Sequence, residues 1–224
     1  MSPGLMSPRK LLRSKNRFVI LECLIVGLLV LVPILNRFTP ARIFLDILLT
    51  AITIFMVYTI SHKKGQVIVG LFLAIVMLAS LWLQYVYPNI GIAAIGMIAG
   101  VLFTAVVITN IMVFMFQSEE VNKETIYAAI LLYLLIGLMW AFIYTFLELV
   151  EPASFNIDLS RPEGYLLVFQ YFSFVTITTL GYGDVTPVTE VAKAFAVLEA
   201  VVGQLYLVII VAWLVGTYKS NKNR

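Results

Sequence analysis

The sequence predicts an all-α membrane protein with six transmembrane helices, plus a shorter re-entrant helix followed by a polar loop. Hydrophobic residues make up 62% of the 224 residues and charged residues only 12%, a composition that excludes an ordinary soluble domain. The charges are clustered, and the gaps between clusters are long enough for a helix of about 20 residues to cross a bilayer. One apolar run, residues 165–177, is too short to cross, and a polar stretch follows it.

The six predicted spans are apolar runs bounded by charged or turn-forming residues. Basic residues precede the first run, which is long for the core of a signal peptide and lacks a small-residue cleavage site, so we expect it to be retained. The single cysteine, Cys23, lies inside this run, so no intrachain disulfide is expected. The runs cover residues 18–35, 43–60, 67–87, 90–116, 126–149 and 191–216.

The distribution of lysine and arginine predicts that both termini lie in the cytoplasm. With the N-terminus inside, 11 of the 15 basic residues fall in cytoplasmic segments and only 4 in outer segments. This is the bias expected for cytoplasmic loops, and an even number of spans returns the C-terminus to the same side. The four outer residues are Arg37, Arg42, Arg161 and Lys193.

The polar stretch after the short run reads T-T-L-G-Y-G-D at residues 178–184. Backbone that is not helical at membrane depth leaves polar groups unsatisfied, so it survives only when it is buried in protein or lines a water-filled path. Gly181 and Gly183 permit backbone angles that place successive carbonyls on one side, which residues with a Cβ resist. The hydroxyl of Thr179 can join the same row. The alternative interpretation is a packing turn between two helices.

Residues 176–184, T-I-T-T-L-G-Y-G-D, resemble the signature of potassium channels, with Leu180 where that family usually has valine or isoleucine. The resemblance extends over an outer helix, a pore helix, the selectivity filter and an inner helix, and the six-span layout is similar to the voltage-gated branch. It implies a homotetramer in the plasma membrane that conducts K⁺ passively, with four filter strands replacing the water shell of the ion. The oxygens that coordinate K⁺ would come from Thr179, Leu180, Gly181, Tyr182 and Gly183, the ions sitting at the first four of these.

The resemblance also assigns supporting residues around the filter, namely Tyr171, Thr178 and Asp184. Where many family members carry a tryptophan pair, this chain has Tyr171 and Phe172, so Asp184 lacks its usual partner and Tyr171 offers it a hydroxyl. Upstream, Ser160 to Glu163 reads S-R-P-E, a capping box that predicts the start of the pore helix.

In the inner helix, the resemblance places a gating glycine at Gly203 and a cavity-facing stripe just after it. The members of the stripe lie 3, 4 and 4 residues apart, which puts them on one helical face; a seam between two helices is the alternative. Glu199 is predicted to face away from the cavity and to brace the structure behind the filter, with Ser173 or Thr176 as partner, rather than to sense protons. The predicted stripe consists of Gln204, Leu207, Val211 and Val215.

The fourth span lacks the basic residues that the voltage-gated branch carries there. No lysine or arginine occurs from Tyr87 to Gln117, so this helix is not expected to gate the channel by moving charge across the membrane field. Gly96 and Gly100 form a G-x-x-x-G pattern that indicates close helix packing. In the first two spans, Glu22 and Asp46 are expected to pair within this domain or with a neighbour, and Arg42 lies one turn before Asp46.

The predicted organisation has a cytoplasmic basic segment (1–17), a four-helix voltage-sensor-like domain without gating charges (18–116), a linker (117–125), a pore domain (126–216) and a cytoplasmic tail (217–224). No catalytic set, cofactor site or nucleic-acid interface is expected, and the eight residues after Gly216 leave no room for a soluble ligand-binding domain. Membrane lipid is the expected surrounding. The alternatives to a potassium channel are a weakly selective cation channel, a potassium transporter subunit, and a non-conducting regulatory subunit.

Overall fold

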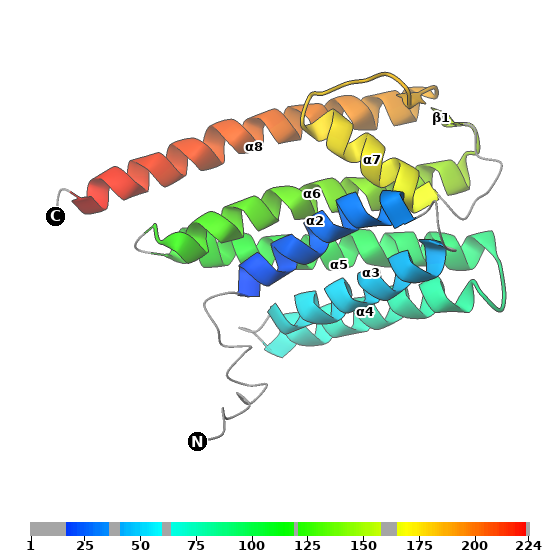
Figure 1. Ribbon diagram of the computed structural model, residues 1–224, viewed down its shortest axis with the longest axis horizontal. Coiled ribbons are helices and arrows are strands. Elements are labelled where there is room, and N and C mark those ends of the chain that lie inside the picture. Colours follow the sequence, from blue (N-terminus) through cyan, green and yellow to red (C-terminus); the bar gives the residue numbers. More distant parts are fainter. Residues whose placement is uncertain (1–16, 36–40, 60–63, 119–120, 158–164, 223–224) are drawn as a thin grey trace.

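The computed structural model describes residues 17–35, 41–59, 64–118, 121–157 and 165–222, and this part of the chain is largely helical, as predicted (Figure 1). Each predicted run coincides with one helix. The boundaries differ most at two ends: α4 ends at Leu83 rather than at residue 87, and α8 continues to Lys222 rather than ending at residue 216. The helices are α2 (Arg17–Leu35), α3 (Ala41–Thr59), α4 (Lys64–Leu83), α5 (Ile90–Gln117), α6 (Lys123–Val150), α7 (Tyr165–Ile177) and α8 (Glu190–Lys222).

Four helices of the described part are long and apolar enough to cross a membrane. The apolar part described for α3, Ile43–Val57, is shorter, and so is α7, Tyr165–Ile177. Both α2 and α3 have 19 residues, and their crossing of a bilayer stays a prediction. The four candidate spans are Gly65–Leu83, Ile90–Gln117, Lys123–Val150 and Glu190–Thr217.

The peripheral helices, α2–α5, lie beside α6, α7 and α8 of the same chain. In Figure 1, α6 runs through the middle of the molecule, with α2 and α5 next to it, α3 and α4 beyond them, and α7 and α8 on the opposite side. The chain passes from α5 to α6 over residues 118–122, and the side chain of Asn122 accepts a hydrogen bond from the Thr125 amide at 3.0 Å to begin α6. This short connection makes α5 and α6 an antiparallel pair.

The two glycines of the G-x-x-x-G pattern allow close contacts with two different helices. A Cβ added at Gly96 would lie 2.2 Å from the hydroxyl oxygen of Ser80 on α4. A Cβ at Gly100 would lie 3.1 Å from the ring of Phe142 on α6. The predicted close packing is therefore present, and the small residues attach α5 to both its neighbours.

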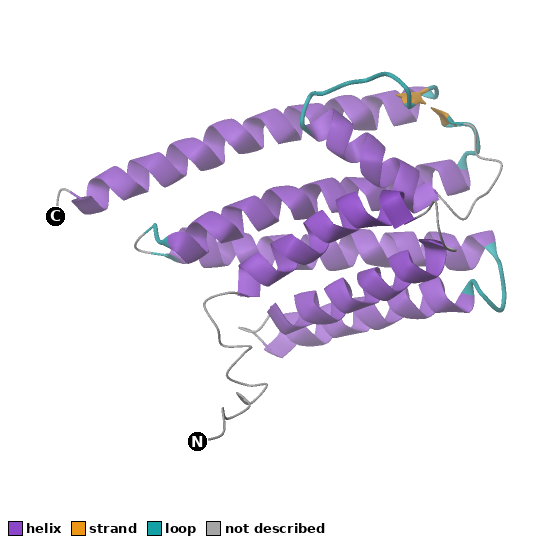
Figure 2. Cartoon of the chain, viewed as in Figure 1, coloured by secondary structure: helices purple, strands orange, loops and turns teal. Residues whose placement is uncertain are grey.

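A short segment links the end of α6 to the start of α8. Strand β1 (Phe155–Asn156) pairs antiparallel with β2 (Thr186–Pro187), a feature that the sequence did not predict, and Figure 2 shows both strands at the end of the molecule where α8 begins. Glu148, buried at the end of α6, accepts hydrogen bonds from the amides of Ala153 at 2.8 Å and Phe155 at 3.1 Å. The carboxylate therefore fixes the turn that precedes β1.

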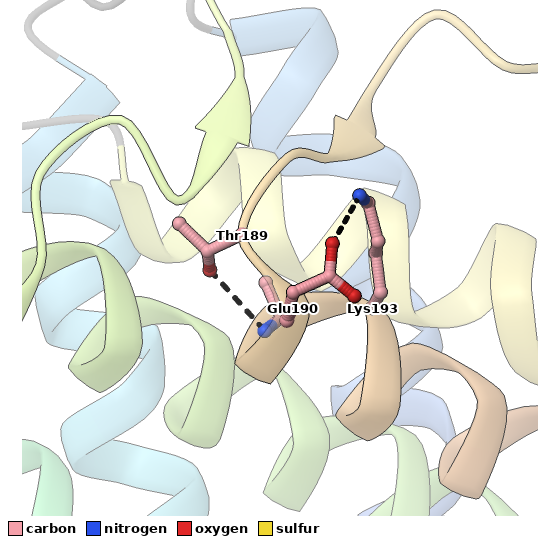
Figure 3. Close-up of polar contacts among 4 residues, drawn as sticks. Thr189, Glu190 and Lys193 are labelled. Atoms are coloured by element: carbon pink, nitrogen blue, oxygen red, sulfur yellow. Dashed lines mark hydrogen bonds and ion pairs between the residues drawn. The ribbon is translucent and has the colours of Figure 1, made fainter.

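The first turn of α8 carries local stabilising contacts (Figure 3). The Ala192 amide donates to the hydroxyl of Thr189 at 3.3 Å, which is an N-cap contact. Lys193 and Glu190 form an ion pair at 2.8 Å one turn apart. Glu190 also lies in the first turn, where a negative charge suits the helix dipole.

Candidate functional site

The loop after α7 alternates between left-handed and ordinary backbone. The φ angles of Thr179, Gly181 and Gly183 are 61°, 59° and 77°, while Leu180 and Tyr182 between them are not in the left-handed region. Such alternation turns successive carbonyls toward the same side, because every second peptide is flipped. A threonine in the left-handed region costs about 1–3 kcal/mol, so the surrounding structure must hold it there.

The C-terminal end of α7 provides that hold. The amides of Leu180 and Gly181 both donate to the carbonyl of Val175, at 2.9 and 3.2 Å, and the Thr179 amide donates to Thr176 at 2.9 Å. From α6, the hydroxyl of Tyr133 donates to the carbonyl of Ile177 at 3.0 Å. The loop thus begins directly on the last turn of α7, while its outward side is open: Leu180 is 54% and Tyr182 67% exposed.

In the ribbon, α7 starts at the end of the molecule where α6 finishes and α8 begins, and the chain that follows it returns to that end (Figure 1). With 13 residues, α7 is about 20 Å long at 1.5 Å per residue, which is less than the thickness of a bilayer core. The S-R-P-E capping box predicted for its start lies outside the described residues. Thr178 donates its hydroxyl to the Phe174 carbonyl at 2.6 Å, so this side chain closes the helix.

Asp184, at the far end of the loop, accepts a hydrogen bond from the hydroxyl of Tyr171 at 2.7 Å. The sequence suggested this partner. The hydrogen bond from Tyr171, supported by the amides of Asp184 and Val185, lowers the pKa of the Asp184 carboxyl below its ordinary value of 3.8. The contact ties the exposed end of the loop back to the middle of α7.

Replacing Tyr171 by phenylalanine should make the loop more sensitive to acid. Because the pKa of Asp184 is lowered, the ionised, bonded form is stable above the ordinary value and is lost as pH falls through the lowered one. Tyr171→Phe removes the largest cause of that shift, so the midpoint for protonation of Asp184 should move to higher pH. A carbon NMR titration of the labelled aspartate carboxyl measures it, and an unchanged midpoint would contradict a role for this contact.

Gly203 lies against the end of α7. A Cβ at this position would be 2.6 Å from Cγ1 and 2.7 Å from the carbonyl oxygen of Ile177, so α8 can approach the start of the loop only without a side chain there. The helix is continuous from Glu190 to Lys222. The close contact is a structural reason for glycine that the sequence did not reveal, and the gating role assigned by resemblance stays a prediction.

The predicted cavity stripe lies on the open part of α8. Its four members are exposed, but so are residues on another face of the helix, including Leu205 at 52% and Ile209 at 56%. Exposure alone does not distinguish a cavity from a protein or lipid contact, so this assignment stays a prediction. Leu207 is 42% exposed, Val211 52% and Val215 50%.

Glu199 faces away from the exposed side of α8 and is completely buried. One carboxyl oxygen lies 2.5 Å from the hydroxyl of Ser173 on α7, the predicted partner, and the other lies 2.6 Å from the hydroxyl of Tyr144 on α6. Sequence reasoning missed Tyr144, whose ring also packs edge-on against the rings of Phe155 and Phe172.

Two further tyrosine contacts join α6 to α8, and both were missed as well. The rings of Tyr133 and Tyr206 lie 5.4 Å apart, and the Tyr206 hydroxyl donates to the carbonyl of Ala129 at 2.5 Å. Farther along α8, Trp213 packs edge-on against Phe116 at the end of α5, with 5.2 Å between ring centroids. Helix α8 is therefore in direct contact with α5 of the same chain.

The acidic residues of the peripheral helices have different surroundings. Asp46 on α3 accepts a hydrogen bond from the hydroxyl of Tyr85 at 2.6 Å, so it does pair within its own domain. For Glu22 on α2, the oxygen Oε1 is buried and has no hydrogen-bond partner among the described residues. Among those same residues, no group of three or more histidine, cysteine, aspartate or glutamate side chains could hold a metal ion.

Comparison with known protein families places the loop and its supporting helices in one domain. Residues 129–219 match the family model described as ion channel, a segment that runs from α6 through α7 and the loop to α8 and leaves α2–α5 outside. No curated protein and no solved structure matched the chain. An ion-channel domain together with the long apolar helices indicates a multi-pass membrane protein. Residues 129–219 therefore resemble an ion-channel domain, which supports a passive ion channel.

Proposed function

We propose that the protein is a homotetrameric, potassium-selective channel of the plasma membrane, with residues 178–184 as its selectivity filter. The observation that supports this most is the alternating backbone at Thr179, Gly181 and Gly183 on an exposed loop held by the end of α7. Rows of backbone carbonyls that replace the hydration shell are how potassium filters bind their ion. The bound K⁺ ions are the permeating substrate, and no catalysis or cofactor is proposed.

The chemistry of the site requires several copies, and the resemblance to potassium channels gives their number as four. One strand offers oxygens from a single side, whereas a dehydrated ion must be surrounded. The exposed Leu180 and Tyr182 would then contact neighbouring subunits, and the two open faces of α8 would serve as a subunit contact and as the cavity wall. In that assembly Gln204, Leu207, Val211 and Val215 would line the water-filled path below the filter.

In this assignment all six long helices cross the membrane, α7 is the re-entrant pore helix, and both termini lie in the cytoplasm. The C-terminal end of α7 points toward the membrane centre, where its partial negative charge would stabilise a hydrated cation. The four helices α2–α5 form a voltage-sensor-like domain without gating charges, since α5 contains no lysine or arginine. Tyr182 argues against a weakly selective pore, and the single G-Y-G loop argues against a transporter subunit.

Rubidium uptake into liposomes containing the purified protein tests the proposal and separates it from a non-conducting subunit. The wild type should take up rubidium when an outward potassium gradient makes the liposome interior negative, with little inhibition by external sodium. Tyr182→Asp should lose that preference, because the aromatic side chain beside the filter supports the spacing of its oxygens. Tyr87→Asp, at an exposed tyrosine in the connection between α4 and α5, is the matched control and should behave as the wild type. Absence of uptake by the wild type would contradict the proposal.

A further inference from the structure

Three helices of the ion-channel domain meet in one row of buried oxygen atoms. The Gly137 carbonyl on α6 lies 2.7 Å from the Ser173 hydroxyl on α7. That hydroxyl lies 2.5 Å from Oε1 of Glu199 on α8, and Oε2 of Glu199 lies 2.6 Å from the hydroxyl of Tyr144, again on α6. Each separation is typical of an O–H···O hydrogen bond. The row thus fastens α7 to the helices on both sides of it.

The number of protons that this row needs exceeds the number that its hydroxyls provide. Three short oxygen–oxygen contacts require three protons, since two oxygens without a proton between them repel each other. A serine and a tyrosine hydroxyl supply one proton each, and a backbone carbonyl supplies none. If Tyr144 donates to Oε2 and Ser173 donates to Gly137, the remaining contact, between Ser173 and Oε1, can be bonded only by a proton on Glu199.

The surroundings of Glu199 favour the same protonation state. Its side chain is fully buried, as is that of Ser173, and a buried carboxylate without a cation is costly. Among the described residues, no basic side chain faces Glu199. Lys193, about one and a half helix turns before it, is paired with Glu190 instead. Two titratable groups face it, both from α6: Tyr144 and, farther away, Tyr133. From α7 the neighbour is Ser173. On α8 itself, Tyr206 lies two turns away and packs against Tyr133.

We propose that Glu199 is a neutral carboxylic acid that positions α7 and, through α7, the loop 178–184. It does so by donating a hydrogen bond to the Ser173 hydroxyl, which in turn donates its own hydrogen bond to the Gly137 carbonyl. The effect on permeation rests on the proposed function; the protonation state does not. Ionising Glu199 would remove one of the three protons and leave a buried charge beside α7. The position of the loop, and with it ion flux, should therefore be lost as pH rises into the range in which Glu199 ionises.

Infrared difference spectroscopy of the purified protein tests the protonation state without any need for conduction. The C=O stretch of a protonated carboxyl should be present in the wild type at neutral pH and absent from Glu199→Gln. Glu151→Gln, at the exposed end of α6, serves as the control and should keep the band. If the wild type and Glu199→Gln show the same protonated-carboxyl signal, Glu199 is ionised and the proposal is wrong.

Rubidium flux as a function of pH tests the positioning role. Glutamine offers a donor group on one branch and an acceptor oxygen on the other, as the protonated acid does. Glu199→Gln should therefore keep flux within about twofold of the wild type and lose its decline at alkaline pH. Glu199→Ala leaves Ser173 and Tyr144 without their partner, and flux should fall about tenfold or more, as expected when buried polar groups lose a hydrogen bond. A wild type whose alkaline decline persists in Glu199→Gln, or a Glu199→Gln protein as impaired as the alanine variant, would overturn the proposal.

Discussion

Replacing Gly181 by alanine should abolish ion flux while leaving the helices folded. The φ angle of Gly181 is +59°, and a Cβ there would meet no atom within 4 Å, so the cost is in the backbone and not in a clash. For a residue with a Cβ this conformation costs about 1–2 kcal/mol. The chain can relieve that cost by rotating one peptide plane, which would turn a carbonyl away from its row. In a tetramer the change occurs in every subunit.

Gly65→Ala is the matched control for this substitution. Gly65 lies in the first turn of α4, has no neighbour within 4 Å of an added Cβ, and shows no left-handed φ. Its replacement should leave rubidium flux unchanged, since alanine is favoured in a helix. Thermal unfolding of both variants should resemble that of the wild type. Flux through Gly181→Ala at the wild-type rate would mean that the loop carbonyls do not form the permeation path.

Gating current should be absent when permeation is blocked, because α5 carries no charge to move. Each elementary charge that crosses the membrane field contributes about 2.3 kcal/mol per 100 mV, and ordinary sensors move 3–4 charges per subunit. Between Tyr87 and Gln117 this chain has no lysine or arginine. Any voltage dependence that remains should be shallow and should arise in the filter, where the permeating ions themselves cross the field.

The competing possibility is that charges on other helices move instead. Asp46 accepts a hydrogen bond from Tyr85 in the turn after α4, which opposes its movement through the field. Glu22 is the other acidic residue in the first two helices. A saturating charge movement of several elementary charges per channel would contradict the account. In that case Asp46→Asn and Glu22→Gln would show which side chain carries it.

The helices could be predicted from the sequence because a bilayer imposes a simple rule. A long apolar run without charges must form a helix that satisfies its own backbone hydrogen bonds, and each such run became one helix. The loop could also be predicted from the sequence, since glycines at alternating positions after a short apolar run have few other structural uses. The left-handed angle at Thr179 was not foreseen, because threonine gives no local signal for it.

The contacts between helices could not be predicted in the same way. Which side chain meets Glu199 depends on how α6, α7 and α8 rotate against one another. Ser173 could be predicted as a partner from its position in α7. Tyr144 could not, since it lies 55 residues away from Glu199 along the chain. The contact of Gly203 with Ile177 could not be predicted either. It arises because the backbones of α8 and α7 approach each other, and a hydrophobic pattern contains no information about that distance.

The most direct test of potassium selectivity is the reversal potential of single channels of the purified protein between potassium on one side of a planar bilayer and sodium on the other. The alternating carbonyl row of residues 179–183 would favour the larger, more readily dehydrated ion. The current should therefore reverse far from zero, at a potential set by potassium, and the reversal should change sign when the two solutions are exchanged. Channels that reverse near zero, passing sodium as readily as potassium, would contradict the account.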